Sequence, residues 1–198
     1  MRTIEFPGVK LEWIVPPASW QHDGRGVTVV AAPRTDIFIN PVDGETTVSA
    51  ARALTSVPDR PWQFGARIGV DFRSAWDAGA LLIWADETRW AKLNFERSPT
   101  GPPGVYSVVT RGRSDDAVGW TIDAAHMWLR ISRIGDAFAF HASDDGRAWQ
   151  LVRQFVLDER VPVRVGIEVQ SPIGDGCTVT FDNLTLSDTH LTNIFDGT

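Results

Sequence analysis

Two short segments of this chain, 90–96 and 163–170, place polar or aromatic side chains at alternate positions. Successive side chains of a β-strand point to opposite faces of its sheet, so each segment would present this set on one face. An aromatic ring beside amide and charged groups is the mixture that binds the C–H face and the hydroxyls of a sugar. The candidate residues are Trp90, Lys92, Asn94, Glu96, Glu168 and Gln170.

Two more residues could complete such a site. Arg111 ends a third alternating segment, 106–111, and Trp120 lies on a stretch expected to be a loop that overhangs the others. If these faces share one concave sheet, they form a ligand-binding groove. The alternative is a solvated outer face, in which the Lys and Arg stems lie along the surface and their charged ends reach water.

Alternating segments of this kind follow one another along the whole chain, and helical periodicity is almost absent. Runs rich in Val, Ile, Trp, Phe and Thr are separated by Gly, Pro and Asp, which is typical of consecutive antiparallel strands. About fourteen short strands at fairly regular spacing favour a large two-sheet sandwich or a barrel. Because no linker or shift in composition divides the chain, we expect a single domain over 1–187 and a C-terminal tail over 188–198.

Charge and composition exclude several classes of partner. The net charge is −6, and the 19 basic residues are scattered rather than clustered. A protein that binds nucleic acid or an anionic membrane needs a basic face, so neither partner is expected. No apolar stretch approaches the ~20 residues of a membrane-spanning helix.

The remaining motifs are sparse. The N-terminal residues lack the apolar stretch of a secretory signal, and the lone Cys177 cannot form an internal disulfide, so a cytoplasmic location is expected. The four His residues lack metal-ligand spacing, and phosphate-binding and dinucleotide-binding motifs are absent. We therefore expect neither a metal nor a cofactor.

Several short motifs occur in a fixed order along the chain. They are Thr35-Asp36-Ile37-Phe38, Asp77-Ala78-Gly79-Ala80-Leu81-Leu82-Ile83-Trp84, Trp90-Ala91-Lys92-Leu93-Asn94-Phe95-Glu96, Trp128-Leu129-Arg130-Ile131, Gly135-Asp136, Ser143-Asp144-Asp145-Gly146-Arg147-Ala148-Trp149, Val165-Gly166-Ile167, Ser171-Pro172, Val179 and Phe181-Asp182. This order resembles the family catalogued as domain of unknown function 1349, in the concanavalin A-like lectin/glucanase superfamily. The resemblance covers roughly residues 10–187. Phe38 stands where the family's motif has Trp.

The resemblance implies an all-β jelly-roll sandwich of two antiparallel sheets, one of them concave. Related sandwiches bind glycans on the concave face or at its rim, some hydrolyse them, and similar domains occur as accessory modules of glycoside hydrolases. Hydrolysis needs two carboxyl groups, and Glu96 and Glu168 are the best-placed pair. Glucanases of this fold carry several carboxylates on one strand, whereas the segment 94–96 of this chain has only one, that of Glu96. Glu96 could equally form an ion pair with Lys92 or Arg111.

These observations predict a non-catalytic domain that binds a carbohydrate or another small molecule. Two alternatives stay open. One is a glycan-active hydrolase that uses Glu96 and Glu168, and the other is a protein-interaction or regulatory domain for a metabolic enzyme. In the second alternative, a sheet face or the rim of loops would bind the partner enzyme.

Overall fold

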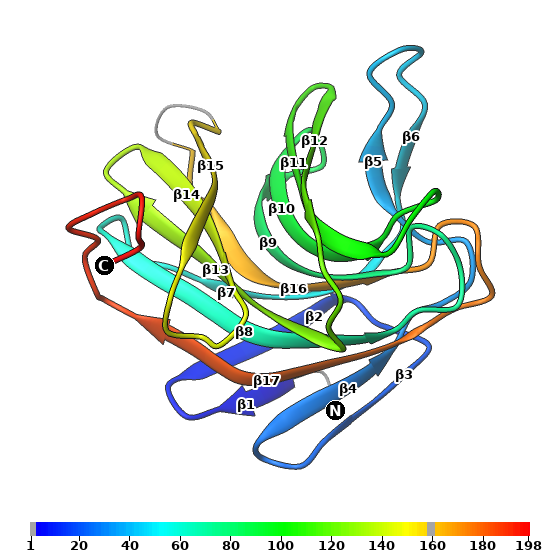
Figure 1. Cartoon of the computed structure of the whole chain (residues 1–198), viewed down its shortest axis with the longest axis horizontal. Helices are drawn as coiled ribbons and strands as arrows, with labels where there is room; N and C mark the ends of the chain where they lie inside the picture. Colours follow the sequence, from blue (N-terminus) through cyan, green and yellow to red (C-terminus); the bar gives the residue numbers. More distant parts are fainter. Residues whose placement is uncertain (1–2, 158–160) are drawn as a thin grey trace.

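Two antiparallel sheets and one separate hairpin make up the computed structural model, which describes residues 3–157 and 161–198 (Figure 1). The eight-stranded sheet contains, in spatial order, β1 (Thr3–Phe6), β2 (Val9–Val15), β7 (Ala51–Ser56), β16 (Arg164–Gln170), β9 (Ala78–Asp86), β10 (Arg89–Arg97), β11 (Pro103–Arg111) and β12 (Ser114–Thr121). The seven-stranded sheet contains β15 (Gln150–Phe155), β14 (Ala137–Ser143), β13 (His126–Ile134), β8 (Trp62–Asp71), β17 (Thr178–Ser187), β4 (Gly26–Val30) and β3 (Ser19–His22). The hairpin is formed by β5 (Ile37–Ile39) and β6 (Thr46–Val48). The all-β fold of two antiparallel sheets is confirmed.

Apolar side chains from the inner faces of both sheets form the main core. On β9 and β10, Leu81, Leu93 and Phe95 are fully buried there, together with Phe64 and Ile68 of β8. This burial fixes the register, because a slip of one residue would move each apolar set to the other face. The residues that alternate with them on β10 therefore face away from the core, on the outer face of the eight-stranded sheet.

The β5–β6 hairpin covers part of this outer face and creates a second, smaller core. Its buried members are Ile37, Ala50, Leu54, Leu82, Trp84, Trp90 and Val108. The hairpin stands beside the upturned ends of β9 to β12 in Figure 1, so the outer face is bounded on two sides. This is the concave face that the sequence predicts.

Three strands of the described structure, β1, β6 and β12, lie outside the runs that the sequence predicts as strands. Residues 114–121 form the edge strand β12 rather than a loop, and they pair with β11. Asp115, Asp116 and Gly119 give this strand little apolar alternation, so its formation depends on the neighbouring strand. The consequence for Trp120 is described below.

The segment 188–198 lies against the seven-stranded sheet. The Arg130 guanidinium donates to the carbonyl of Gly197 at 2.6 Å, and His141 Nε2 lies 2.7 Å from the carbonyl of Ile194. Leu191 in the same segment is buried. The sequence predicts this segment as a tail. In the structure, these contacts attach it to β13 and β14.

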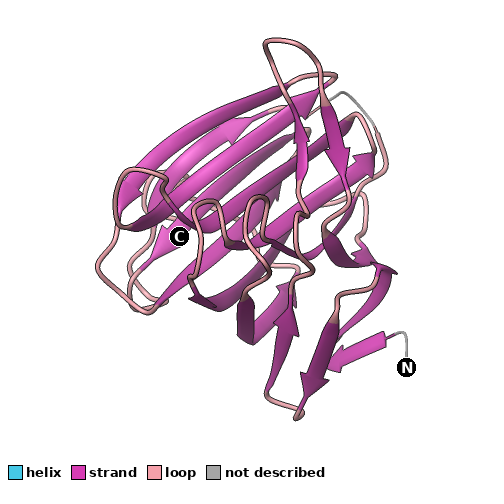
Figure 2. Cartoon of the chain, turned by 90° about the vertical axis from the view of Figure 1, so that its right-hand side faces the viewer, coloured by secondary structure: helices cyan, strands magenta, loops and turns pink. Residues whose placement is uncertain are grey.

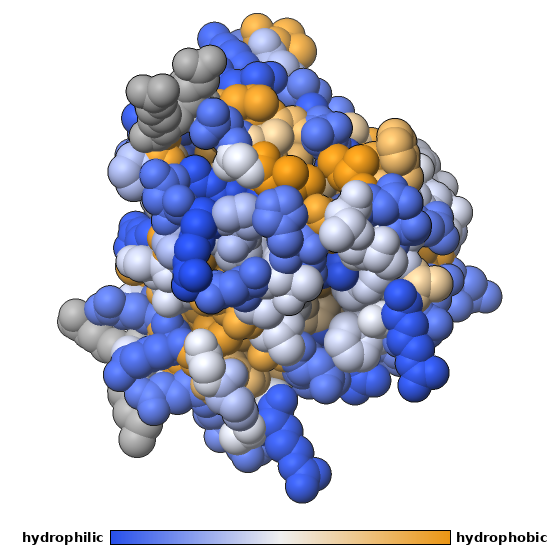
Figure 3. All heavy atoms as spheres, turned by 90° about the vertical axis from the view of Figure 1, so that its left-hand side faces the viewer, coloured by the Kyte–Doolittle hydropathy of each residue, from blue (hydrophilic) through white to orange (hydrophobic). Residues whose placement is uncertain are grey.

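The described residues form strands and loops, as Figure 2 shows. In that part of the chain, no helix is long and apolar enough to cross a membrane. Hydrophilic residues cover most of the face drawn in Figure 3, and apolar residues appear between them in separate groups.

Candidate ligand-binding pocket

A pocket of about 280 Å³ opens on the outer face of the eight-stranded sheet, next to the β5–β6 hairpin. Its lining residues come from β5, β10, β11, β12, β16 and three loops, and they are Asp36, Phe38, Trp76, Lys92, Asn94, Glu96, Val108, Asp116, Gln170, Pro172 and Ile173. Polar side chains of β10 form its floor. Ala78 and Ala80 of β9 lie opposite Glu96 and Asn94 in register, and their small side chains leave room above the sheet.

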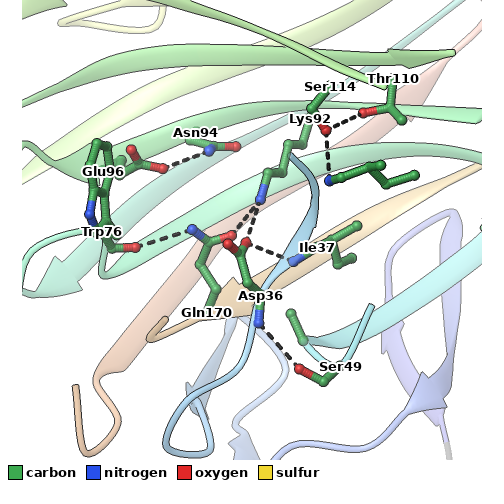
Figure 4. A network of polar contacts seen from close by, with 12 residues as sticks. Asp36, Ile37, Ser49, Trp76, Lys92, Asn94, Glu96, Thr110, Ser114 and Gln170 are labelled. Carbon is green, nitrogen blue, oxygen red and sulfur yellow. Dashed lines mark hydrogen bonds and ion pairs between the residues drawn. The ribbon is translucent and has the colours of Figure 1, made fainter. Parts of the chain in front are cut away.

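Lys92 is the centre of a buried polar network (Figure 4). Its ammonium group donates to Asp36 Oδ1 at 3.0 Å and to Gln170 Oε1 at 2.5 Å, and the residue is only 2% exposed. Burial by itself lowers the pKa of Lys92. The negative charges of Asp36, Glu168 and Glu96 outweigh this effect, so the pKa is raised above its usual value. Lys92 therefore stays charged inside the fold.

Glu96 and Asn94 lie side by side on the floor. Asn94 Nδ2 donates to Glu96 Oε2 at 2.8 Å, and Glu96 is 5% exposed. Burial raises the pKa of Glu96 to about 8, against the opposing effects of Lys92 and of the Asn94 hydrogen bond. The other amide atom, Asn94 Oδ1, is buried without a hydrogen-bond partner in the described part of the chain.

Trp76 forms one wall, on the loop between β8 and β9. Its backbone φ is 69°, a left-handed conformation that is costly for a bulky residue. The buried carboxylate of Asp77 holds this loop, because it accepts the backbone N–H groups of Arg73 and Ser74 and the hydroxyl of Ser171. Gln170 Nε2 donates to the carbonyl of Trp76 at 3.1 Å. The strained residue is thus held over the floor by the same side chain that binds Lys92.

The hairpin brings Asp36 and Phe38 to the opposite wall. Ile39 N donates to Ser114 Oγ at 2.9 Å, which fixes the hairpin to β12. Asp36 Oδ1 accepts the N–H of Ile37 at 2.7 Å as well as the Lys92 ammonium. The Asp36–Lys92 ion pair therefore fastens the hairpin to the floor of the pocket.

The pocket contains four of the residues that the sequence points to, namely Lys92, Asn94, Glu96 and Gln170. The expected ion pair of Glu96 with Lys92 or Arg111 is not formed among the described residues, since Glu96 bonds to Asn94 and Lys92 pairs with Asp36. Residues four apart on a strand lie roughly 13 Å apart along it, too far for an ion pair between Glu96 and Lys92.

Trp90 and Glu168 lie on the same outer face but outside the pocket lining. Trp90 is fully buried in the cluster beneath the β5–β6 hairpin. Glu168 is also fully buried, and neither of its carboxylate oxygens has a hydrogen-bond partner among the described residues. Burial raises the pKa of Glu168 to about 7, although the positive charges of Lys92 and Arg52 oppose this. A ligand in the pocket would therefore meet Glu96 and not Glu168.

Arg111 and Trp120 lie away from the pocket, which corrects the expectation for both. On β11 the pocket side belongs to Val108, and Arg111, three residues later, points to the other face and donates to the carbonyl of Val156. Trp120 packs against the main core between the sheets. The register of β12 shifts near Gly104, which changes the face of the residues beyond Val118.

Seven lining residues are not among the site residues that the sequence predicts. They are Asp36, Phe38, Trp76, Val108, Asp116, Pro172 and Ile173. Asp36 and Phe38 lie within one of the motifs that resemble the family, and this motif could have marked them as candidates. For Trp76, the sequence offers only its position next to Asp77, and the contacts of Asp77 are visible only in the folded chain.

The stacked sheets and the pocket on the concave face define an antiparallel β-sandwich protein. The chain belongs to the family described as "Protein of unknown function (DUF1349)", which matches residues 13–189. This confirms the family resemblance over most of the chain.

Relatives and solved structures are consistent with this fold. The chain is 25% identical over 176 residues, 88% of each protein, to "Regulation of enolase protein 1" of Saccharomyces cerevisiae. A crystal structure of a functionally unknown protein from Saccharomyces cerevisiae is similar with a TM-score of 0.84 and 24% identity, over 91% of this chain and 97% of that one.

More distant structures share the fold alone. Carbohydrate binding module CBM66 from Bacillus subtilis is similar with a TM-score of 0.54 and 17% identity, over 88% of this chain and 94% of that one. The GH43 protein BlXynB from Bacillus licheniformis gives a TM-score of 0.73 and 12% identity over 90% of this chain. This chain spans only 37% of that enzyme, so the likeness concerns one part of it.

Proposed function

We propose that this protein is a non-catalytic domain that binds a small polyhydroxylated ligand, a sugar unit, in the pocket on the concave face. The observation that carries the proposal is the buried Asn94 Oδ1, which lacks a partner among the described residues in a pocket walled by Trp76 and Phe38. Buried polar atoms are normally hydrogen-bonded, and a ligand hydroxyl would supply the missing donor.

The size and lining of the pocket support a ligand of this class. A volume of about 280 Å³ is near the lower end of small-molecule sites, which suits one sugar unit better than a long chain. The half-buried rings of Trp76 and Phe38 offer apolar faces, while Asp36, Asn94 and Glu96 offer oxygen acceptors. The fold of CBM66 is in keeping with this role, although a shared fold is only weak support for a shared function.

A glycan array followed by titration calorimetry tests the proposal. We expect a mono- or disaccharide to bind, and Trp76→Ala and Asn94→Ala each to weaken binding by about tenfold, as loss of a stacking or hydrogen-bonding contact does. Trp149→Ala is the matched control, because Trp149 is equally half-buried but stacks on Arg130, outside the pocket. An array without hits, or equal losses for Trp76→Ala and Trp149→Ala in folded protein, would contradict it.

The yeast relative supports a second candidate function. Because its name refers to the regulation of enolase, we propose as the alternative that this domain regulates a metabolic enzyme through direct contact. Ile173, which lines the pocket, is 52% exposed, and Val118, two residues after the lining residue Asp116, is 70% exposed. These are the apolar side chains that a partner protein would cover.

Sedimentation velocity with purified enolase tests the alternative. We expect a complex that Val118→Asp and Ile173→Asp disrupt. Phe195→Asp is the control, since Phe195 is 75% exposed but belongs to the C-terminal segment. Separate sedimentation of the two proteins at high concentration would contradict direct regulation of enolase.

A further inference from the structure

The pocket combines one positively charged donor with several oxygen acceptors that have no hydrogen-bond partner in the described part of the chain. Of the described residues that line it, Lys92 alone carries a positive charge, and two of its three N–H groups already bind Asp36 and Gln170. Gln170 uses one of its two amide N–H groups for the carbonyl of Trp76, and Asn94 uses one of its two for Glu96. One N–H therefore remains on each of Lys92, Gln170 and Asn94, and Lys92 is the one cation among the described lining residues.

The free acceptors lie on the floor and the walls. Asn94 Oδ1 is buried and unpartnered, and Glu96 uses only Oε2 toward Asn94, which leaves Oε1 without a hydrogen bond within the described residues. Asp36 likewise uses only Oδ1 toward Lys92 and Ile37. A carboxylate or phosphate ligand offers acceptors only, so it would leave the unpartnered oxygens of Asn94 and Glu96 without a donor.

The charges of the pocket point in the same direction. Lys92 is matched by Asp36, while Glu96 forms no ion pair with any described residue and Asp116 adds another carboxyl at the exposed rim. The negative charges of Asp116 and Asp36 contribute to the raised pKa of Glu96. A positive charge on the ligand favours the ionised form of a nearby carboxyl group, so an ammonium group would lower the pKa of Glu96 and bind its carboxylate.

We propose that the ligand of this pocket carries a protonated amino group that binds Glu96 Oε1 and Asn94 Oδ1, so that the pocket prefers an amino sugar to the neutral and acidic sugars of the same stereochemistry. An ammonium group has three donors and no acceptor, which is the complement of this floor. The indole of Trp76 adds an electron-rich face on which a cation is also favourable. The inference rests on the proposed binding of a sugar unit and adds the charge of the ligand.

Titration calorimetry at neutral pH with three matched series tests the inference. The probes are the 2-amino sugar, the neutral hexose and the uronic acid with the gluco, galacto and manno configurations. In the series that binds, we expect the amino sugar to bind about tenfold more tightly than the neutral hexose, since a hydrogen bond to a charged group contributes more than a neutral one. The uronic acid should bind most weakly.

Two variants test whether Glu96 causes the preference for the amino sugar. Glu96→Gln keeps the shape of the side chain but cannot ionise when the ammonium group binds, so we expect the ratio of the two affinities to fall toward one. Asp59→Asn is the control, because this carboxylate is 93% exposed and pairs with Arg133 on the other sheet, and the ratio should be unchanged.

The outcomes separate the two proposals. Equal affinities for the amino and neutral sugars, tightest binding of the uronic acid, or a ratio that Glu96→Gln leaves unchanged would overturn the inference and leave sugar binding in place. If no sugar of any series binds, the proposed function fails and this inference fails with it.

Discussion

Lys92 is the residue on which the polar side of the concave face depends. A buried ammonium group is costly unless paired, and here Asp36, Gln170 and the nearby Glu168 compensate it. Removal of the charge would leave buried carboxylates without a counterion. The chain offers a close comparison, because its other lysine, Lys10, forms an exposed ion pair with Glu5.

We expect Lys92→Met to lower the free energy of unfolding by roughly 3–5 kcal/mol, the usual effect of breaking a buried ion pair from one side. Lys10→Met should change it by less than about 1 kcal/mol, because exposed pairs contribute little. Urea denaturation of the two variants measures both values. Equal losses in the two would show that Lys92 is not needed to compensate the buried carboxylates.

Glu168 and Glu96 make the stability of the fold depend on pH. Their pKa values are raised to about 7 and about 8 in the folded protein, from a usual value of 4.5. Between pH 4.5 and these raised pKa values, the folded state holds protons that the unfolded chain releases, so rising pH favours unfolding. The contribution is most stabilising at the acidic end of the window and is lost as pH rises to 8.

Glu168→Gln cannot titrate, so its free energy of unfolding should fall less steeply with pH than that of the unmodified protein. For one group the difference in slope is roughly 1 kcal/mol per pH unit. Urea denaturation at several pH values between 5 and 8 measures it, with the exposed Glu12→Gln as the control. Parallel curves for Glu168→Gln and the unmodified protein would exclude Glu168 as a source of the dependence.

At the scale of the elements, two connections between strands build the walls of the pocket. The β5–β6 hairpin is fixed by the Asp36–Lys92 ion pair and by Ser114, and the β8–β9 loop is fixed by Asp77. The buried carboxylate of Asp77 accepts two backbone N–H groups and one hydroxyl, and it lies next to the strained Trp76. Such strain persists only where the surroundings hold it.

We expect Asp77→Ala to lower the free energy of unfolding by roughly 2–4 kcal/mol, because it leaves buried donors without acceptors. It should also weaken binding of the ligand, since Trp76 could relax from its left-handed conformation. Asp71→Ala is the comparison, because Asp71 is exposed and binds the Arg73 side chain at the start of the same loop. Denaturation and calorimetry of both variants check this, and unchanged affinity in Asp77→Ala would separate the loop from binding.

At the scale of the whole molecule, both sheets and the C-terminal segment form one connected structure. Each sheet gives its inner face to the main core, while the outer face of the eight-stranded sheet carries the pocket and the smaller core. The C-terminal segment occupies the outer face of the other sheet, where the carbonyl of Gly197 accepts a hydrogen bond from Arg130. Arg130 is half-buried, and burial lowers its pKa to about 10.

We expect a variant that ends at Ser187 to lose roughly 2–4 kcal/mol of stability, since Arg130 and His141 would each lose a carbonyl partner and Leu191 would no longer be buried. Phe195→Ala, in the same segment but 75% exposed, should change stability by less than about 1 kcal/mol. Thermal and urea denaturation measure both. A shortened chain of full stability would show that the segment is not part of the folded unit.

Local patterning was sufficient to predict the sheets and the floor of the pocket. The two-residue period separates the two faces of each strand, so it groups Lys92, Asn94 and Glu96 on one face of β10 and places Gln170 on the polar face of β16. The pairing of both strands with β9 brings these two faces together in one sheet. The order of the motifs indicated the family and, through it, the sandwich. Turn residues and the absence of helical periodicity excluded other fold classes.

Only the tertiary structure decided which of these residues a ligand can reach. Trp90 and Glu168 have the same alternation as the floor residues, but the hairpin covers one and neighbouring side chains bury the other. The walls, Asp36 and Trp76, come from loops, which have no period to read, and Lys92 meets Asp36 across 56 positions of the chain. A strand pattern specifies which face a side chain joins, whereas its cover and its partners depend on how distant segments pack.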